Sequence, residues 1–287
     1  MSSDHRDSSE HHKYSEKIHT LWDELGDFGS REIDAALKHC MLGLCDLIAA
    51  DNAMWLGLVQ LNDSYKPANG TRPTAKFDWG EPSSMERDPM NGWRIGAMEP
   101  LYSRSTEDER KRYQAWRKID DKPGDTSRTI AARAGHFRTY TLHDGFIDIT
   151  KFRKTRHYDF FYRELDIVDR MWVVFPISAN SESCFVFDRQ NNAQCFTQDE
   201  IKLAKQCLRG IKWFHRQILL SHGLGICEAK LTPTERRVLG YLLTGESEKD
   251  IAAKLNVKPS SIHQYCVSTY RKYGVRGRVE LMSLWLS

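Results

Sequence analysis

The stretch that most restricts the fold is residues 231–273, where helix start and stop signals follow one another at short intervals. Thr232 and Glu235 form a T-x-x-E capping box, and Pro233 stands at the first helical position, where its missing N–H costs nothing. Gly245 is placed to end this helix. We therefore expect one short amphipathic helix, whose inward residues are Val238, Leu239 and Leu242.

A second helix and a tight turn follow directly. Ser247 is the expected cap of that helix, with Asp250 three residues on. Asn256 tolerates the left-handed backbone that a tight turn needs, and we expect Val257 to plug the core between the two helices. Pro259 then starts a third helix. Two short helices around such a turn, the second with a polar outer face, are typical of a helix-turn-helix unit.

The third helix, residues 258–273, combines a narrow apolar stripe with a polar face. The stripe, at helical spacing, consists of Ile262, Tyr265 or Cys266, Thr269 and Tyr273. The opposite face holds hydrogen-bond donors, with Val267 as its one apolar exception: His263, Gln264, Ser268, Arg271 and Lys272. A helix that buries so little and presents so many donors predicts a polar partner.

The charge of the chain is concentrated in the same region. Residues 228–287 hold ten Lys or Arg and six Asp or Glu, whereas the whole chain has 42 and 39. The other 227 residues are therefore almost neutral, with 32 basic and 33 acidic side chains. This distribution favours a small module that binds an anion and a larger one that does not.

Residues 231–281 resemble the DNA-binding domain of LuxR-type regulators, also called the GerE type. The matching pieces are LTPTE, the G-x-S-x-K-x-IA segment, the L-x-V turn, the S-I pair and R-K-x-GV-x-x-R-x-EL. The resemblance implies an all-α, four-helix, helix-turn-helix domain over residues 231–287. It also implies that the third helix enters the major groove of double-stranded DNA, where donors read base edges and basic groups meet phosphates.

The resemblance also assigns roles to residues. The family's base-reading positions fall on His263, Gln264 and Val267; Gln264 suits adenine and Val267 a thymine methyl. Its phosphate-contacting positions match Lys249, Ser261, Arg271 and Lys272, with Thr232 as a further candidate. In such domains the last helix often dimerises, and the matching apolar side chains are Val279, Met282, Trp285 and Leu286, with Trp285 expected at the surface. The alternative is that they only close the small core.

Upstream of this domain, the predicted elements indicate an α+β domain with a mainly antiparallel sheet. Residues 1–17 are polar and predict a disordered tail. Helices are expected at 30–50 with Ser30 as N-cap, from the Thr106-x-x-Glu109 box onward, at 155–165, and at 198–221 as one long helix stopped by Gly223. Strands are expected at 52–61 and 93–102, with a strand or loop at 137–146 and a hairpin over 170–188.

These elements divide the chain into a sensory or dimerisation domain over 18–222, a linker over 223–230 and the DNA-binding domain. The order of the upstream elements resembles GAF-like or PAS-like sensory domains. The βα alternation of a phosphate receiver is missing. An acyl-homoserine-lactone pocket usually shows W-x-x-x-Y, and no tryptophan here is followed by Tyr four residues on. The length and order still allow a domain like those that bind autoinducers.

Aromatic side chains of the upstream domain are candidates to line a ligand pocket, because aromatic walls with a few polar tips are typical of such sites. The candidates are Trp55, Trp79, Trp93, Tyr102, Trp116, Tyr158, Phe161, Tyr162 and Trp172. For each of them, packing in the core is the competing interpretation.

Enzymatic chemistry is not indicated. The sequence has no G-x-S-x-G, P-loop or G-x-G-x-x-G, and its histidines lack the spacing of a metal site. Its seven cysteines form no C-x-x-C pair, so neither a zinc site nor a disulfide framework is expected. The N-terminus lacks the apolar core of a signal peptide, and no apolar run approaches the ~20 residues of a membrane span. We expect a cytoplasmic protein that needs no cofactor.

The sequence thus predicts a DNA-binding transcriptional regulator controlled by a small molecule in its N-terminal domain. The expected partners are double-stranded DNA, a second copy of the chain, a small-molecule effector and the transcription machinery, with no membrane. The homodimer would form through the 30–50 or 198–221 helix. The alternative is a regulator that binds no ligand and is controlled by a partner protein, by dimerisation or by the redox state of Cys184 or Cys195.

Overall fold

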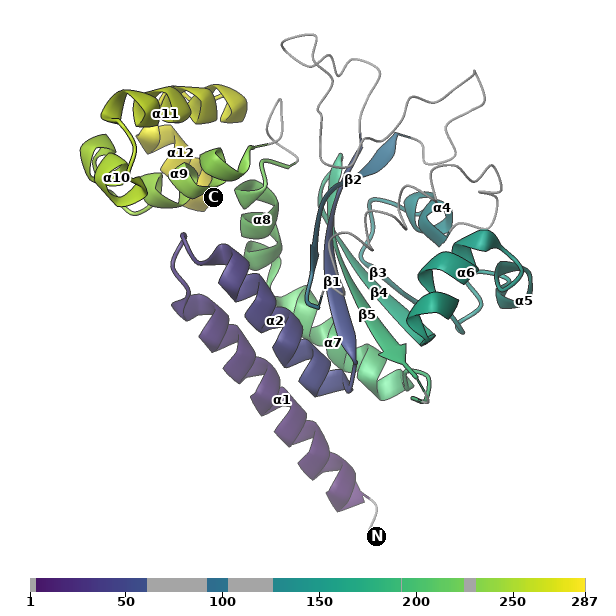
Figure 1. The fold of residues 1–287 in the computed structure, drawn as a ribbon. Coiled ribbons are helices and arrows are strands. Elements are labelled where there is room, and N and C mark those ends of the chain that lie inside the picture. The colour runs from purple at the N-terminus through teal and green to yellow at the C-terminus, as the bar shows by residue number, and fades with distance from the viewer. Residues whose placement is uncertain (1–3, 61–91, 103–125, 192, 225–230, 287) are drawn as a thin grey trace.

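The computed structural model describes residues 4–60, 92–102, 126–191, 193–224 and 231–286. A five-stranded sheet with helices forms the N-terminal domain, and a helical bundle forms the C-terminal domain (Figure 1). The N-terminal elements are α1 (Asp4–Asp27), α2 (Ile33–Ile48), β1 (Asn52–Gln60), β2 (Trp93–Pro100), α4 (Thr126–Ala131), β3 (Arg138–Thr141), α5 (Ile149–Phe152), α6 (Arg156–Phe161), η1 (Arg163–Leu165), β4 (Ile167–Ser178), β5 (Ser181–Gln190), α7 (Gln198–Gly210) and α8 (Lys212–Ser221). The C-terminal elements are α9 (Pro233–Leu242), α10 (Glu248–Leu255), α11 (Pro259–Tyr273) and α12 (Arg278–Leu286).

The sheet has the order β2-β1-β5-β4-β3, and every neighbouring pair is antiparallel. This confirms the expected α+β class. The predicted hairpin is β4 and β5, joined by Ala179 and Asn180. The strands at 52–61 and 93–102 are confirmed as β1 and β2, and the undecided 137–146 segment holds the short strand β3. The helix expected from Thr106 onward lies outside the described residues.

Each face of the sheet has its own apolar core. Helices α1, α2, α7 and α8 cover one face, and α4, α5 and α6 lie on the other side (Figure 1). Because side chains alternate along a strand, β1 sends Trp55 to the α2 side and Met54 and Leu56 to the α6 side. We call these two layers the α2 face and the α6 face.

Two predictions at the N-terminus are wrong. Residues 4–27 form the helix α1 rather than a disordered tail over 1–17, because Ile18, Leu21 and Leu25 bury one side of it against the rest of the α2 face. Helix α2 begins at Ile33 after Glu32, without a side-chain cap. The Ser30 hydroxyl, expected to cap α2, instead lies 3.5 Å from the Gly240 carbonyl of the C-terminal domain.

The expected long helix over 198–221 is also wrong, because it breaks at Ile211 into α7 and α8. The Trp22 indole packs where a side chain on Gly210 would be: an added Cβ there would lie 2.2 Å from the ring. Carbonyls at the end of α7 find partners outside the helix. The Cys207 carbonyl accepts from Trp22 Nε1 at 3.0 Å, and the Leu208 carbonyl accepts from His215 Nε2 at 2.8 Å.

Buried polar groups join the strands to these helices. Because His215 Nε2 donates to a carbonyl, its Nδ1 accepts from the Ser183 hydroxyl at 2.7 Å, and Trp55 Nε1 donates to the same hydroxyl oxygen at 2.8 Å. Burial lowers the pKa of His215 to about 4, so the ring is neutral at physiological pH. The chain of bonds fixes β1, β5, α7 and α8 in one arrangement.

The C-terminal domain has its own core, built by α9 to α12. Both predicted capping boxes are formed, at Thr232/Glu235 and Ser247/Asp250, and Asn256 has the expected left-handed backbone with φ 53°. Two side chains differ from expectation. Val257, expected to fill the core between the two helices, is 41% exposed, because the turn directs its side chain outward. Trp285, expected at the surface, is 9% exposed and packs in the core.

Across the described ranges, every helix is too short or too polar to span a membrane.

Candidate nucleic-acid interface

Helix α11 is held by its buried stripe against α9 and α10. Ile262, Cys266, Thr269 and Tyr273 are all buried, as the spacing predicts, whereas Tyr265 is half-buried. Pro259 starts the helix and Gly274 ends it with φ 64°. The stripe therefore fixes which face of α11 points out.

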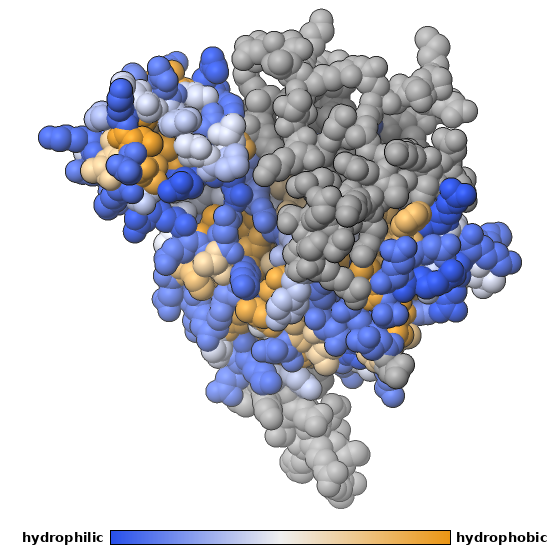
Figure 2. Space-filling model, in the orientation of Figure 1, coloured by the Kyte–Doolittle hydropathy of each residue, from blue (hydrophilic) through white to orange (hydrophobic). Residues whose placement is uncertain are grey.

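That outward face contains the predicted base-reading residues. His263, Gln264 and Arg271 are exposed, and Val267 is 51% exposed although it is apolar. Lys249, on α10, is also exposed. Figure 2 shows blue and pale side chains around an orange, apolar patch on the part of the C-terminal domain where α11 lies. A helix held on one side with donors and one methyl-bearing side chain on the other has the form that fits a major groove.

Two of the predicted contact residues already have partners within the domain. His263 Nδ1 lies 3.1 Å from Glu248 Oε2, and the two side chains are 66% and 41% exposed, so DNA can compete for the histidine. Lys272 Nζ donates to Glu235 Oε2 at 2.6 Å, with both side chains mostly buried. Lys272 therefore links α11 to α9 in this structure. Ser261, another predicted phosphate contact, is half-buried near the start of α11.

Glu235 has a larger structural role than a helix cap. Its carboxylate accepts from the Thr232 backbone N–H, from the Ser268 hydroxyl at 2.7 Å and from Lys272. Burial alone would raise the pKa of Glu235, but the hydrogen bonds from Lys272 and Thr232 outweigh it and hold that pKa below its usual value. The ionised carboxylate thus ties the first helix to the reading helix.

Arg278 was missed as a site-positioning residue. Its guanidinium donates to the carbonyls of Leu242 at 2.6 Å, Glu246 at 2.5 Å and Tyr241 at 3.1 Å. These carbonyls lie at and just beyond the end of α9, where helix geometry leaves acceptors without partners. The signal available in the sequence was the arginine of the R-x-EL piece, which identifies the residue but not its carbonyl partners.

Comparison with known families agrees with this geometry. Residues 229–285 match the family described as bacterial regulatory proteins, luxR family. The C-terminal domain is a LuxR-family domain. The match covers the two capping boxes, the left-handed turn at Asn256 and all of α11.

Curated relatives match only a short part of the chain. Two putative HTH-type transcriptional regulators, Mb0914c of Mycobacterium bovis and MT0914 of Mycobacterium tuberculosis, are each 42% identical over 52 residues, which is 18% of this chain. The match spans only 6% of the length of either relative. A match this short assigns no role to the rest of the chain.

Among solved structures, weak likenesses extend over most of the chain. Escherichia coli SdiA is 12% identical with a TM-score of 0.44, and the alignment covers 93% of this chain and 94% of SdiA. The VqsR ligand-binding domain of Pseudomonas aeruginosa is 12% identical with a TM-score of 0.42, over 72% of this chain and 97% of that one. Likenesses of this size assign no role to the N-terminal domain.

The candidate pocket aromatics do not form one group. The α6 face holds Tyr158, Phe161, Tyr162 and Trp172. Trp93 lies on the same side of the sheet, because it pairs with Gln60, and Gln60 shares its side of β1 with Met54, Leu56 and Leu58. Trp55 is on the α2 face, hydrogen-bonded to Ser183, so it cannot share a pocket with them. Tyr102 is 55% exposed. Trp79 and Trp116 lie outside the described residues.

Within the α6 face, Tyr162 stands at a polar centre. Its ring lies 4.6 Å from the Arg170 guanidinium carbon, and its hydroxyl lies 3.4 Å from Thr126 Oγ1. Arg170 is paired with Asp188 through two hydrogen bonds, of 2.5 and 2.8 Å. Burial raises the pKa of Tyr162, so its hydroxyl stays protonated and able to donate.

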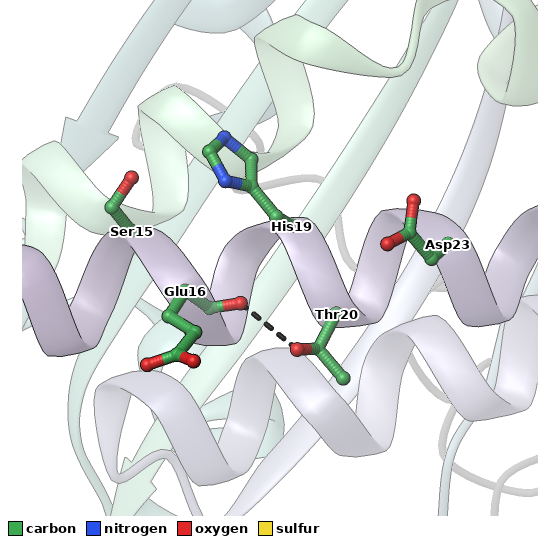
Figure 3. A pocket seen from close by; sticks show the side chains of 5 residues that line it. All are labelled: Ser15, Glu16, His19, Thr20 and Asp23. Carbon is green, nitrogen blue, oxygen red and sulfur yellow. Dashed lines mark hydrogen bonds between the residues drawn. The ribbon is translucent and has the colours of Figure 1, made fainter.

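Two other features do not form sites. A shallow recess on α1 is lined by five side chains of that one helix, with the Thr20 hydroxyl donating to the Glu16 carbonyl at 3.0 Å (Figure 3). Cys184 is buried, and burial raises its pKa to about 12; the pKa of the exposed Cys195 is also raised by burial and by Asp169. Raised pKa values disfavour the thiolates that a redox sensor needs.

Proposed function

We propose that this chain is a sequence-specific DNA-binding transcriptional regulator that acts as a cytoplasmic homodimer. The observation that carries the proposal is the free face of α11 in a LuxR domain: the helix is buried along one stripe while His263, Gln264 and Val267 point outward. Gln264 would read adenine by a bidentate contact and Val267 would contact a thymine methyl. Lys249 and Arg271 would meet phosphates.

The dimer follows from the size of the reading surface. One α11 reaches few base pairs, so a single copy would discriminate poorly against the many competing sites of a genome. Two copies on one duplex read two half-sites about one helical turn apart. On α12, Val279 and Leu286 are 83% and 82% exposed, which makes them available for such pairing, whereas Trp285 is not.

We further propose that a small molecule bound on the α6 face controls the regulator. Five pocket candidates share this side of the sheet with the buried polar centre at Tyr162, the combination of aromatic walls and polar tips that orients a ligand. The rival is a regulator without a ligand, controlled by a partner or by dimerisation. What favours the rival is that Tyr162 is only 1% exposed and is stacked on Tyr158, as in an ordinary core.

The DNA proposal is tested with duplexes selected from a random pool by the full-length chain. Gln264→Ala should lose about 1–3 kcal/mol of binding to selected duplexes and relax preference at one base pair per half-site. Arg271→Ala should weaken binding to all duplexes and reduce the slope of log affinity against log salt by about one. Lys202→Ala, which removes an exposed lysine on α7, is the matched control and should change neither.

The outcome that would reject the reading face is wild-type binding by both α11 variants, on selected and on random duplexes. The ligand proposal is tested separately with Tyr162→Phe, which keeps the packed ring and removes the hydroxyl near Thr126. Native mass spectrometry of protein expressed in cells should show a bound small molecule with the wild type and less with the variant. An equal absence of ligand from both proteins would favour the rival.

A further inference from the structure

Helix α10 presents a carboxylate to one of the proposed base-reading side chains of α11. Glu248 is the first residue of α10 and directly follows the Ser247 cap. Its two carboxylate oxygens lie 3.4 and 3.1 Å from Nδ1 of His263. An ionised carboxylate only accepts hydrogen bonds, so Nδ1 of His263 carries the hydrogen of this contact. The ring nitrogen that faces α10 is thereby fixed as a donor.

A second contact with α11 holds Glu248 in place. The Cys266 thiol lies one turn beyond His263, in the buried stripe that packs α11 against α9 and α10. Burial raises the pKa of Cys266 to about 11, helped by the charge of Glu248 and a hydrogen bond to it, so the thiol stays protonated and able to donate. A carboxylate in the first turn of a helix is also favoured by the helix dipole. Glu248 therefore joins a fixed part of α11 to an exposed one.

The other ring nitrogen of His263, Nε2, is the one left for DNA. The side chain is 66% exposed, and in the described part of the chain its hydrogen bonds are made by Nδ1. In a neutral imidazole one nitrogen carries a hydrogen and the other a lone pair. With the hydrogen held on Nδ1, Nε2 keeps the lone pair and accepts hydrogen bonds. The contact with Glu248 thus decides what the outer nitrogen can read.

The major groove separates the bases by whether they offer a hydrogen-bond donor. Adenine offers the amino group at N6 and cytosine the amino group at N4, whereas guanine and thymine offer only acceptors there. We call the first two the amino bases and the other two the keto bases. An accepting Nε2 forms a hydrogen bond with an amino base. Opposite a keto base two acceptors face each other, and both stay unpaired once water is excluded, which disfavours that complex.

We propose that Glu248 is a specificity-determining residue, which keeps Nε2 of His263 an acceptor and so makes α11 select an amino base over a keto base. The proposal rests on the proposed binding of DNA by α11. Glu248 acts through the histidine, so it is a positioning residue. The reading state is the neutral ring beside the ionised carboxylate. A charged ring would donate from Nε2 and would select the keto bases instead.

The first experiment measures the tautomer of His263 in the full-length chain without DNA. Long-range proton–nitrogen spectra at about pH 8, where free imidazole is neutral, distinguish the two nitrogens of each histidine ring. The His263 signals are those that disappear in His263→Ala. In the wild type the hydrogen should be on Nδ1, and in Glu248→Leu, which keeps a side chain of similar size, it should move at least partly to Nε2. A hydrogen on Nε2 in the wild type, or an unchanged tautomer in the variant, would overturn the proposal.

The second experiment measures base preference at the same pH. Duplexes carry each of the four bases at the one position per half-site where His263→Ala loses its preference. The wild type should bind the amino bases about tenfold more tightly than the keto bases. Glu248→Leu should lose most of this ratio and keep the preferences at positions read by Gln264 and Val267. The control Glu280→Gln removes the same charge at the start of α12, keeps an acceptor for the Arg276 N–H, and should leave the ratio unchanged.

The double variant separates Glu248 from its histidine. In the His263→Ala background, Glu248→Leu should not change base preference any further. A further loss would mean that the carboxylate contacts the base itself, which contradicts the proposal. A wild-type preference for keto bases at this position would show a donating Nε2 and would also reject it. If the wild type selected no duplex from a random pool, the DNA-binding proposal and this one would fall together, so the two failures are distinguishable.

Discussion

The two domains specify their structures over very different distances along the chain. In the LuxR domain, Thr232 with Glu235, Ser247 with Asp250 and the turn at Asn256 fix helix boundaries through residues a few positions apart. In the N-terminal domain, the hydrogen bonds that hold strands and helices together join distant residues. Trp55 and Ser183 are 128 positions apart, and Trp22 and Cys207 are 185 positions apart. Local signals can be read directly from a sequence, whereas remote pairings cannot.

The largest expected effect tests the remote pairings. Glu182 on β5 accepts two hydrogen bonds from Arg138 on β3, at 2.8 and 2.7 Å, and both side chains are almost fully buried. Glu182→Ala leaves the arginine charge buried without its partner, so unfolding of the N-terminal domain should become easier by about 3–5 kcal/mol. Chemical denaturation of the full-length chain, followed by tryptophan fluorescence, measures this loss.

The control for that prediction is an ion pair of the same kind at the surface. Lys202 Nζ lies 2.9 Å from Asp199 Oδ1, with both side chains more than two thirds exposed. Lys202→Ala should therefore change stability by no more than about 0.5 kcal/mol. If the two variants were equally stable, the remote buried pairs would not be what holds this domain together.

The second prediction concerns pH and His215. Burial lowers the folded-state pKa of His215 from 6.5 to about 4, so the unfolded chain takes up a proton at higher pH than the folded chain does. The contribution of His215 to the free energy of unfolding is therefore complete above pH 6.5 and is lost as the pH falls from 6.5 to 4. The loss is about 1.4 kcal/mol per pH unit and about 3 kcal/mol in all. Denaturation midpoints measured at several pH values give the slope.

Carboxylates also titrate at the acid end, so the comparison is made between pH 6.5 and 5. His215→Gln cannot take up the proton, and its stability should change less with pH over that window than that of the wild type. Parallel slopes for the two proteins would show that the histidine is not held neutral by the folded structure.

The smallest expected effect tests the local signals of the LuxR domain. Thr232→Ala removes the hydroxyl that accepts from the Glu235 backbone N–H, and should destabilise α9 by about 1 kcal/mol. Thr234→Ala, two positions on, removes a threonine hydroxyl that is not part of the capping box and should be nearly neutral. Thermal unfolding followed by circular dichroism compares the two. Equal losses would mean that the capping box does not set this helix boundary.

These distances explain which sequence predictions succeeded. Hydrophobic periodicity, helix caps and turn residues lie close together along the chain, and they correctly predict three features. These are the helix-turn-helix unit, the hairpin of β4 and β5, and the strand β1. The outward positions of His263, Gln264 and Val267 follow in the same way from the stripe of α11. Their contacts with DNA stay predictions.

The predictions that were wrong concern features that depend on residues far away in the sequence. The break at Ile211 depends on an indole that arrives from α1, so periodicity over 198–221 gives no warning of it. The separation of Trp55 from Tyr162 depends on which face each strand position takes, and the composition of a candidate pocket does not reveal that. Trp285 is buried because the rest of the small bundle closes over it, which the sequence of α12 alone does not show.

The break at Ile211 also changes the mechanics of the chain. One unbroken helix over 198–221 would be a lever about 36 Å long, able to carry a twist from Thr197 to the junction with the LuxR domain. The structure instead bends at Ile211, and the segment beyond the bend is only the ten residues of α8, about 15 Å. The hydrogen bond from His215 Nε2 of α8 to the Leu208 carbonyl of α7 spans the bend and holds the two short helices at one angle. Helix α8 also contacts β4, β5 and α2, so a movement of the sheet or of α2 reaches the LuxR domain over the length of this short helix alone.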